Sequence, residues 1–273
     1  MRINTNVPAI TGTHALTRTN NSLNTNFHRL STGLRINRAA DDSAGLGVSE
    51  SLRTQVRGLQ QAMRNANDGI SIVQTAEGAL NEIHNNLQRL RELAVQSASD
   101  TLEATERAYV NTEATQLVNE INRLSNASTF NGIQLLDGSS SSLAVHVGSG
   151  TSTVNDQITI TLADSTSSAL GVTGVDLSTS ATSLAAMTLI DTAITSVSST
   201  RANLGAVQNR LGSAINSIQT AVENLSSAES QIRDADFAYE TASMAKNQVL
   251  QQSGISVLSQ ANSNSQNILK LLG

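Results

Sequence analysis

The sequence predicts a mainly α-helical protein in which both chain ends form a long coiled-coil-like helical bundle, with a small β-hairpin region at its tip. Apolar residues recur every three or four positions from Leu52 to Ala94 and again from Met187 to Ile232, which places them on one face of a helix. Aromatic residues make up 2% of the chain and proline occurs once, so slender helix packing is favoured over a bulky core. Between these stretches the apolar period changes to the alternation of strands.

The first long stretch has the spacing of a coiled-coil seam, with a repeat of about 3.5 residues. No proline interrupts residues 44–97, which predicts a rod of roughly 80 Å. A core helix of an ordinary globular domain is the alternative, and the length of the rod disfavours it. The repeat is irregular between Val73 and Leu80, where we expect local overwinding. The seam should contain Leu59, Ile70, Leu80 and Leu87.

The second long stretch predicts the partner of the first. Its spacing and length nearly match those of the first stretch, so each can bury its seam against the other. A shorter helix over 103–126, starting near Asp100, should return antiparallel along the rod. The seam of the second stretch should contain Ile215, Ile218, Val222 and Leu225.

The two chain ends carry thin apolar stripes. Residues 5–34 and 237–272 have helical spacing but few large apolar residues, so each helix is marginal until it meets a partner. Gly33 is suited to ending the first helix, and Asp41, Asp42 or Ser43 to capping the next. The residues expected to pack between the terminal helices are Leu23, Phe27, Leu30, Leu258, Ile268 and Leu272.

A β region is predicted at residues 130–183. Large apolar residues alternate with small or polar ones in 143–147 and in 158–162, and glycines between the two runs supply turns. The segment is rich in Ser, Thr and Gly, which is typical of an exposed tip.

Composition excludes several classes of function. The net charge is −5 and basic residues are scattered, which argues against a nucleic-acid surface. No apolar run reaches the roughly 18 residues of a membrane span, and the amino terminus lacks a hydrophobic signal core. The four histidines are far apart and no metal-ligand spacing occurs, so we expect no enzyme, cofactor or metal site. An enzyme remains the rival class. The basic residues Arg29, Arg35 and Arg38 precede Asp41 and Asp42, as in a solvated or salt-bridged turn.

Several motifs together resemble bacterial flagellin. They are Arg29–Asn37 with Asp41–Gly45, Arg64–Ser71, Glu77–Leu80, LQRLRELAVQ at Leu87–Gln96, Phe130–Gly132 and Leu250–Asn262. Together they cover roughly 1–138 and 205–273. The resemblance identifies the chain as a member of the flagellin family without the large outer domains that bigger members place at 139–183.

The resemblance implies a secreted subunit of the hollow flagellar filament used for motility. It implies an inner domain of residues 1–43 and 236–273 and a middle domain of residues 44–235. Unfolded export through the flagellar type III apparatus without a cleaved signal peptide is also implied. The implied partners are other copies of the chain, an export chaperone, and the cap and hook-junction proteins. A hook–filament junction protein with the same terminal helices is the alternative.

Innate immune receptors recognise many flagellins through the middle-domain helices. The resemblance carries the contact positions to Arg89, Leu93 and Glu113. These residues lie beside the predicted seams, so we expect them to be exposed. Packing between copies in the filament is the alternative explanation of the same residues.

Overall fold

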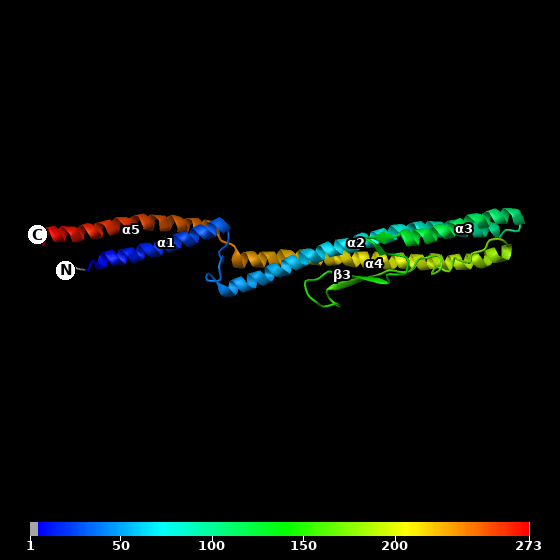
Figure 1. Ribbon diagram of the computed structural model, residues 1–273, viewed down its shortest axis with the longest axis horizontal. Helices are drawn as coiled ribbons and strands as arrows, with labels where there is room; N and C mark the ends of the chain where they lie inside the picture. The colour runs from blue at the N-terminus through cyan, green and yellow to red at the C-terminus, as the bar shows by residue number, and fades with distance from the viewer. Residues whose placement is uncertain (1–4, 273) are drawn as a thin grey trace. The chain divides into compact units, whose positions relative to one another are not determined.

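A computed structural model describes the backbone of residues 5–272 and the side chains of residues 5–264 and 266. Its long elements are helices that agree with the predicted stretches (Figure 1). The helices are α1 (Val7–Thr32), α2 (Ser43–Ser97), α3 (Ala104–Ala127), α4 (Ser180–Arg233) and α5 (Phe237–Leu272). The strands are β1 (Thr129–Phe130), β2 (Ile133–Gln134), β3 (Ser142–His146) and β4 (Gln157–Thr161).

The chain divides into two compact units. We call Met1–Val56 with Glu223–Gly273 the terminal unit, and Arg57–Val222 the middle unit. The division falls inside α2 and α4, whereas the sequence placed it at the helix breaks near residues 43 and 236. The domain bounds implied by the resemblance stay a prediction about the assembled subunit.

Local chemistry explains how the helices of the terminal unit begin and end. The Asn6 side chain accepts a hydrogen bond from the Ala9 amide at 3.2 Å, which satisfies a free N–H in the first turn of α1. Gly33 ends α1 with a φ of 72°, a conformation that glycine adopts without strain. Asp42 accepts from the Gly45 amide at 2.8 Å and caps α2. Helices α1 and α5 then lie side by side (Figure 1).

The middle unit is built from α2, α3 and α4. Helices α2 and α4 run antiparallel, as shown by the ion pair between Arg91 and Asp191 and the contact of Met63 with Gln219. Helix α3 starts at Ala104, where the Glu103 amide donates to the Glu106 carboxylate at 3.2 Å. The helix therefore begins after Asp100, near which the sequence predicted its start. The core contains side chains from all three helices and from the β3–β4 hairpin.

The hairpin is present, but it lies elsewhere than expected. Strands β3 and β4 pair antiparallel with Val145 opposite Ile158, and both residues belong to the main core. The Asn65 side chain of α2 donates to the His146 carbonyl at 3.2 Å. The hairpin therefore covers α2 instead of forming an exposed tip. The reason is that one face of the hairpin is apolar and has to be buried against another element, and the alternation in the sequence does not say which element that is.

Candidate functional site

The predicted seam residues lie inside the subunit. Leu80 and Leu87 are fully buried and Ile218 is 5% exposed. Leu59, Ile70, Ile215 and Val222 are half-buried against the same core, and Leu225 is half-buried in the terminal unit. The seam therefore holds α2 and α4 together, and a site for partners has to be sought elsewhere.

The predicted contacts between the terminal helices are only partly present. Leu23 is buried, and Leu30 and Leu258 are half-buried. Phe27 is 53% exposed, contrary to the expectation, because its neighbour Asn26 occupies the buried position at 6%. The side chains of Ile268 and Leu272 lie outside the described residues.

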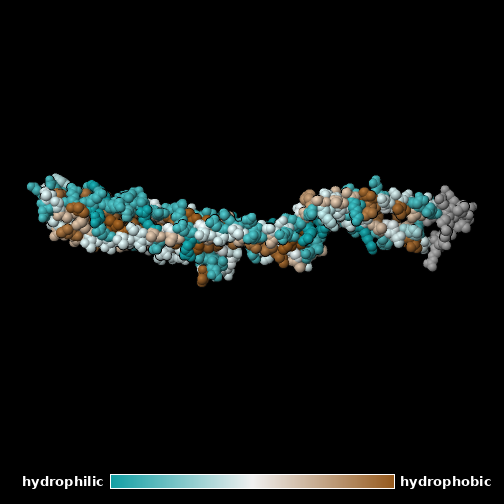
Figure 2. All heavy atoms as spheres, turned by 180° about the vertical axis from the view of Figure 1, so that it is seen from behind, coloured by the Kyte–Doolittle hydropathy of each residue, from teal (hydrophilic) through white to brown (hydrophobic). Residues whose placement is uncertain are grey.

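Helices α1 and α5 carry many exposed apolar side chains. We call the following residues the terminal apolar surface: Val7, Ile10, Phe27, Phe237, Tyr239, Val249, Leu250, Ile255 and Val257, which are 47–71% exposed. Figure 2 shows brown patches on this unit near the grey atoms of the chain ends. Exposed apolar side chains gathered on one unit make that unit the candidate interface with another protein.

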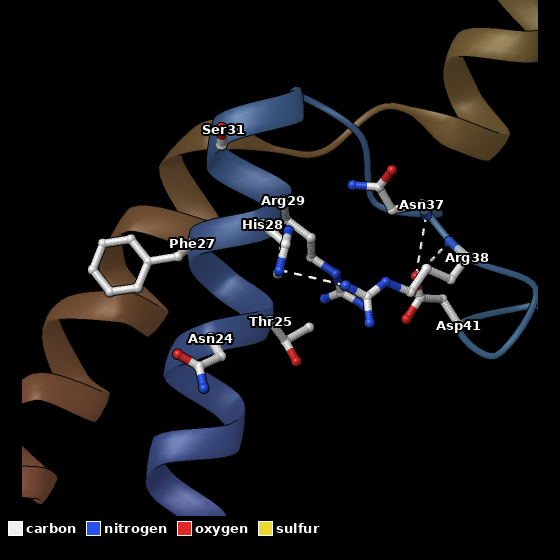
Figure 3. A pocket seen from close by; sticks show the side chains of 9 residues that line it. All are labelled: Asn24, Thr25, Phe27, His28, Arg29, Ser31, Asn37, Arg38 and Asp41. Atoms are coloured by element: carbon white, nitrogen blue, oxygen red, sulfur yellow. Dashed lines mark hydrogen bonds between the residues drawn. The ribbon is translucent and has the colours of Figure 1, made fainter.

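A cleft of about 650 Å³ lies between the end of α1 and the connector to α2 (Figure 3). The predicted salt-bridged turn is different in detail. Arg29 pairs with Glu240 at 2.9 Å, and Arg38 lies 3.4 Å from the His28 ring. The Asp41 carboxylate accepts from the Arg38 and Asn37 amides at 3.0 and 3.1 Å.

These amide hydrogen bonds, from Arg38 and then Asn37, lower the pKa of Asp41, and the charges of Arg29 and Arg38 contribute to the same shift. Glu240 is 4% exposed and was missed by the sequence interpretation. Its partner is 211 residues away in the chain, so no local pattern identifies it.

The three positions carried over as receptor contacts have different environments. Arg89 lies 2.9 Å from Glu113 and 3.0 Å from Glu92, and all three side chains are about half exposed or more. The carboxylates of Glu92 and Glu113 raise the pKa of Arg89.

Leu93 is 1% exposed and packs in a cluster with Val110 and Ala114 of α3. The expectation that Leu93 is exposed is therefore wrong. The reason is that α2 is covered on two sides, by α3 as well as by α4, so its buried face is wider than one seam.

No helix of residues 5–272 combines the length and apolarity that a bilayer-spanning segment requires. Within the same part of the chain, no three potential metal ligands converge.

Comparisons with known proteins cover most of the chain. The family described as bacterial flagellin N-terminal helical region matches residues 3–141, and that described as bacterial flagellin C-terminal helical region matches residues 187–272. The flagellin of Bacillus subtilis (strain 168) is 40% identical, over 100% of both chains. The flagellin of Halalkalibacterium halodurans and the flagellar filament 33 kDa core protein of Treponema phagedenis are each 41% identical, also over 100% of both chains.

Solved structures show a similar architecture. The crystal structure of Bacillus cereus flagellin is 31% identical and covers 57% of this chain and 88% of its own, with a TM-score of 0.51. The structure of a putative flagellar hook-associated protein from Vibrio parahaemolyticus has a TM-score of 0.59 over 71% of this chain and 100% of its own. Its identity is only 14%, so this likeness concerns the fold alone.

Proposed function

This chain belongs to the bacterial flagellin family and is a structural subunit of the flagellar filament, and we propose that it assembles by burying the terminal apolar surface against other copies of itself. The observation that carries the proposal is the concentration of exposed apolar side chains on α1 and α5. The alternative, a hook–filament junction protein, has weaker support. The hook-associated structure is 14% identical, whereas filament proteins are about 40% identical over the whole chain.

The energetics favour assembly through the chain ends. Fully burying one Val, Leu, Ile or Phe side chain contributes roughly 1.5–3 kcal/mol. The terminal apolar surface comprises nine residues that are 47–71% exposed, so covering all of them contributes roughly 6–19 kcal/mol. That gain is of the same size as the cost of association, roughly 4–15 kcal/mol, and can offset it. Within the subunit, α1 buries only Leu23 and Asn26, so the pairing of α1 with α5 is weak before assembly.

Seeded elongation tests this proposal. Purified subunit is added to short filament fragments, and growth is followed by light scattering and electron microscopy. We expect Val249→Ser with Val257→Ser, at positions 64% and 63% exposed, to slow elongation strongly. Val154→Ser, at an 85% exposed position in the middle unit, is the matched control and should elongate normally. Equal rates for both variants would contradict the proposal.

Hydrogen exchange tests the order of the chain ends. The backbone amides of α1 and α5 should exchange rapidly in the soluble subunit and become protected in the filament, because assembly supplies the missing apolar cover. Strong protection of both helices before assembly would show that they pair stably without neighbours.

Export and its partners form the next part of the proposal. The chain leaves the cell unfolded through the flagellar type III apparatus, with an export chaperone holding α5 and with cap and hook-junction proteins at the growing filament. The exposed apolar side chains of α5 support a chaperone there, since a segment with Val249, Leu250 and Ile255 on its surface requires cover before assembly. Deleting the export apparatus should leave the subunit inside the cell, and secretion in that strain would contradict this route.

Arg89 and Glu113 are the proposed contacts of an innate immune receptor. Their support is that both are about half exposed and lie together on α2 and α3. Leu93 is buried, so its proposed role is to hold α3 in place. Receptor affinity of the soluble subunit should fall for Arg89→Ala, whereas Arg123→Ala, another exposed arginine, serves as the control. An unchanged affinity for Arg89→Ala would discard the assignment.

The proposal includes no catalytic activity. Its support is that the relatives are flagellins and filament core proteins. A hydrolase survey on purified subunit is the test, and a turnover that follows the subunit through purification would contradict it.

A further inference from the structure

The apolar contacts between α1 and α5 are thin and repetitive. Leu16, Leu23 and Leu30 are spaced by seven residues on α1, and the contacts of Leu16 and Leu258 are made with glycines of the other helix. A Cβ placed on Gly12 would lie 3.1 Å from Leu258, and one on Gly254 would lie 3.5 Å from Leu16. Because α1 repeats its leucines every seven residues, a shift of one heptad again places leucines on the face toward α5, and α1 of a second copy presents the same face. The leucine repeat of α1 therefore supplies affinity without selecting a partner, whereas the close fit of Leu258 at Gly12 contributes to the register.

Polar contacts between the two helices are more specific. Arg29 pairs with Glu240 at 2.9 Å, and the side chains of Asn26 and Ser243 lie 3.0 Å apart. The Gln251 amide donates to Asn20 at 2.8 Å. We call these three contacts the polar pairs.

The polar pairs follow a single antiparallel register. Arg29 comes three residues after Asn26, and Glu240 comes three residues before Ser243. Two of the side chains are buried, since Asn26 is 6% and Glu240 is 4% exposed. Buried polar and charged groups require their partners, because a group left unpaired away from water is strongly unfavourable.

Other pairings leave the two charged groups without an opposite charge. Shifting α5 by seven residues places Asn247 opposite Arg29 in one direction, and Ser22 opposite Glu240 in the other. Helix α1 contains no acidic residue, so pairing α1 with α1 of a second copy cannot neutralise Arg29. Glu240 is the single acidic residue of α5, so pairing α5 with α5 brings two carboxylates into one interface.

The geometry points to the polar pairs as the specificity-determining contacts of the chain ends: they select α5 of the same chain, in this register, as the partner of α1. This role goes beyond the assembly function, in which the exposed surface contacts neighbouring copies. Selecting the correct partner is important during assembly, because many identical helices come close together in the filament. Wrong partners are rejected by contacts that those partners cannot make.

Disulfide trapping tests the selection, since the chain contains no cysteine. Leu16→Cys with Gly254→Cys reports the observed register. Leu16→Cys with Asn247→Cys or with Ala261→Cys reports a shift of one heptad in either direction. Leu16→Cys alone reports pairing of α1 between copies. Each full-length reporter is oxidised as soluble subunit and as filament, and intrachain and interchain disulfides are separated on non-reducing gels and identified by mass spectrometry.

In the parent chain we expect the Leu16–Gly254 reporter to dominate among the disulfides that form, in the soluble subunit as well as in the filament, because frequent opening of the two helices changes how often they pair and not which partner they select. The double variant Asn26→Leu with Glu240→Leu replaces the two buried polar side chains by apolar ones and removes two of the polar pairs. It should raise the shifted and interchain disulfides by roughly tenfold relative to the observed register. Exchanging the charges, by Arg29→Glu with Glu240→Arg in one chain, should restore the parent pattern. Arg29→Glu alone should not restore the parent pattern, because it places a carboxylate at position 29 beside that of Glu240.

Three results would overturn the inference. The double variant could retain the parent pattern, which would mean that the backbone bridge between Leu34 and Asp234 selects the pairing without the polar pairs. The charge exchange could fail to restore the observed register. The parent chain could fail to form the Leu16–Gly254 disulfide. Because the soluble subunit is measured separately, a failure of elongation alone leaves this test intact.

Discussion

Two glycines of α2 provide a matched test of how the hairpin packs. Gly69 is buried, and a Cβ added there would lie 3.1 Å from Val145 of the hairpin and 3.3 Å from Leu211 of α4. Gly78 lies on the same helix, is exposed, and would meet no atom within 4 Å. Replacing each glycine by alanine raises the helix propensity in the same way at two positions with different surroundings.

We expect Gly78→Ala and Gly69→Ala to change the free energy of unfolding by different amounts. Alanine is favoured over glycine inside a helix by about 1 kcal/mol, so Gly78→Ala should stabilise the subunit by about 0.5–1 kcal/mol. At Gly69 the same gain is opposed by overpacking, which costs roughly 1–3 kcal/mol. Gly69→Ala should therefore be neutral or destabilising by up to about 2 kcal/mol.

Urea unfolding followed by circular dichroism measures both variants against the parent. Val145→Ala is the diagnostic partner, because it removes the methyl groups that Gly69→Ala would meet. The cost of Gly69→Ala should shrink in that background, and the double-mutant cycle isolates the contact. Equal stabilisation by both glycine variants would refute the packing of the hairpin on α2.

Two further predictions concern the candidate contacts. Leu93→Ala should destabilise the subunit by about 2–5 kcal/mol, because Leu93 is 1% exposed. Arg89→Ala should change the stability by less than about 0.5 kcal/mol, since the ion pairs of Arg89 are exposed. Thermal unfolding of both variants distinguishes a folding effect from a binding effect. Asp41 has a pKa lowered mainly by the Arg38 and Asn37 amides, so its contribution to the connector is present above pH about 4 and is lost as the pH falls through the lowered value. Asp41→Asn should reduce the acid sensitivity of hydrogen exchange in residues 33–42, and an unchanged acid profile would contradict this role.

Much of the fold follows from local patterns. The helix period predicted α2 close to its observed bounds and α4 from Met187 onward, although α4 begins at Ser180, and Gly33 and Asp42 act where their chemistry suggested. The family was also recognisable from motifs spread along the chain. These features depend on neighbouring residues, so a single sequence contains the information.

The site residues were less accessible to sequence reasoning. Phe27 belongs to an apolar stripe, yet Asn26 takes the buried place beside α5. Heptad positions specify the buried face of a helix only within about one residue. When the apolar stripe is thin, the packing of the partner helix decides which of two neighbouring residues is buried. The polar pairs join residues more than 200 positions apart, so spacing along the chain could not indicate them.

The sequence by itself determined the helices, the helix ends at Gly33 and Asp42, the antiparallel hairpin and the membership of a family. Only the tertiary structure decided that Leu93 is buried, that the hairpin covers α2 and that Glu240 pairs with Arg29. The physical reason is that periodicity reports which face of an element is apolar, whereas burial depends on how many other elements cover that face.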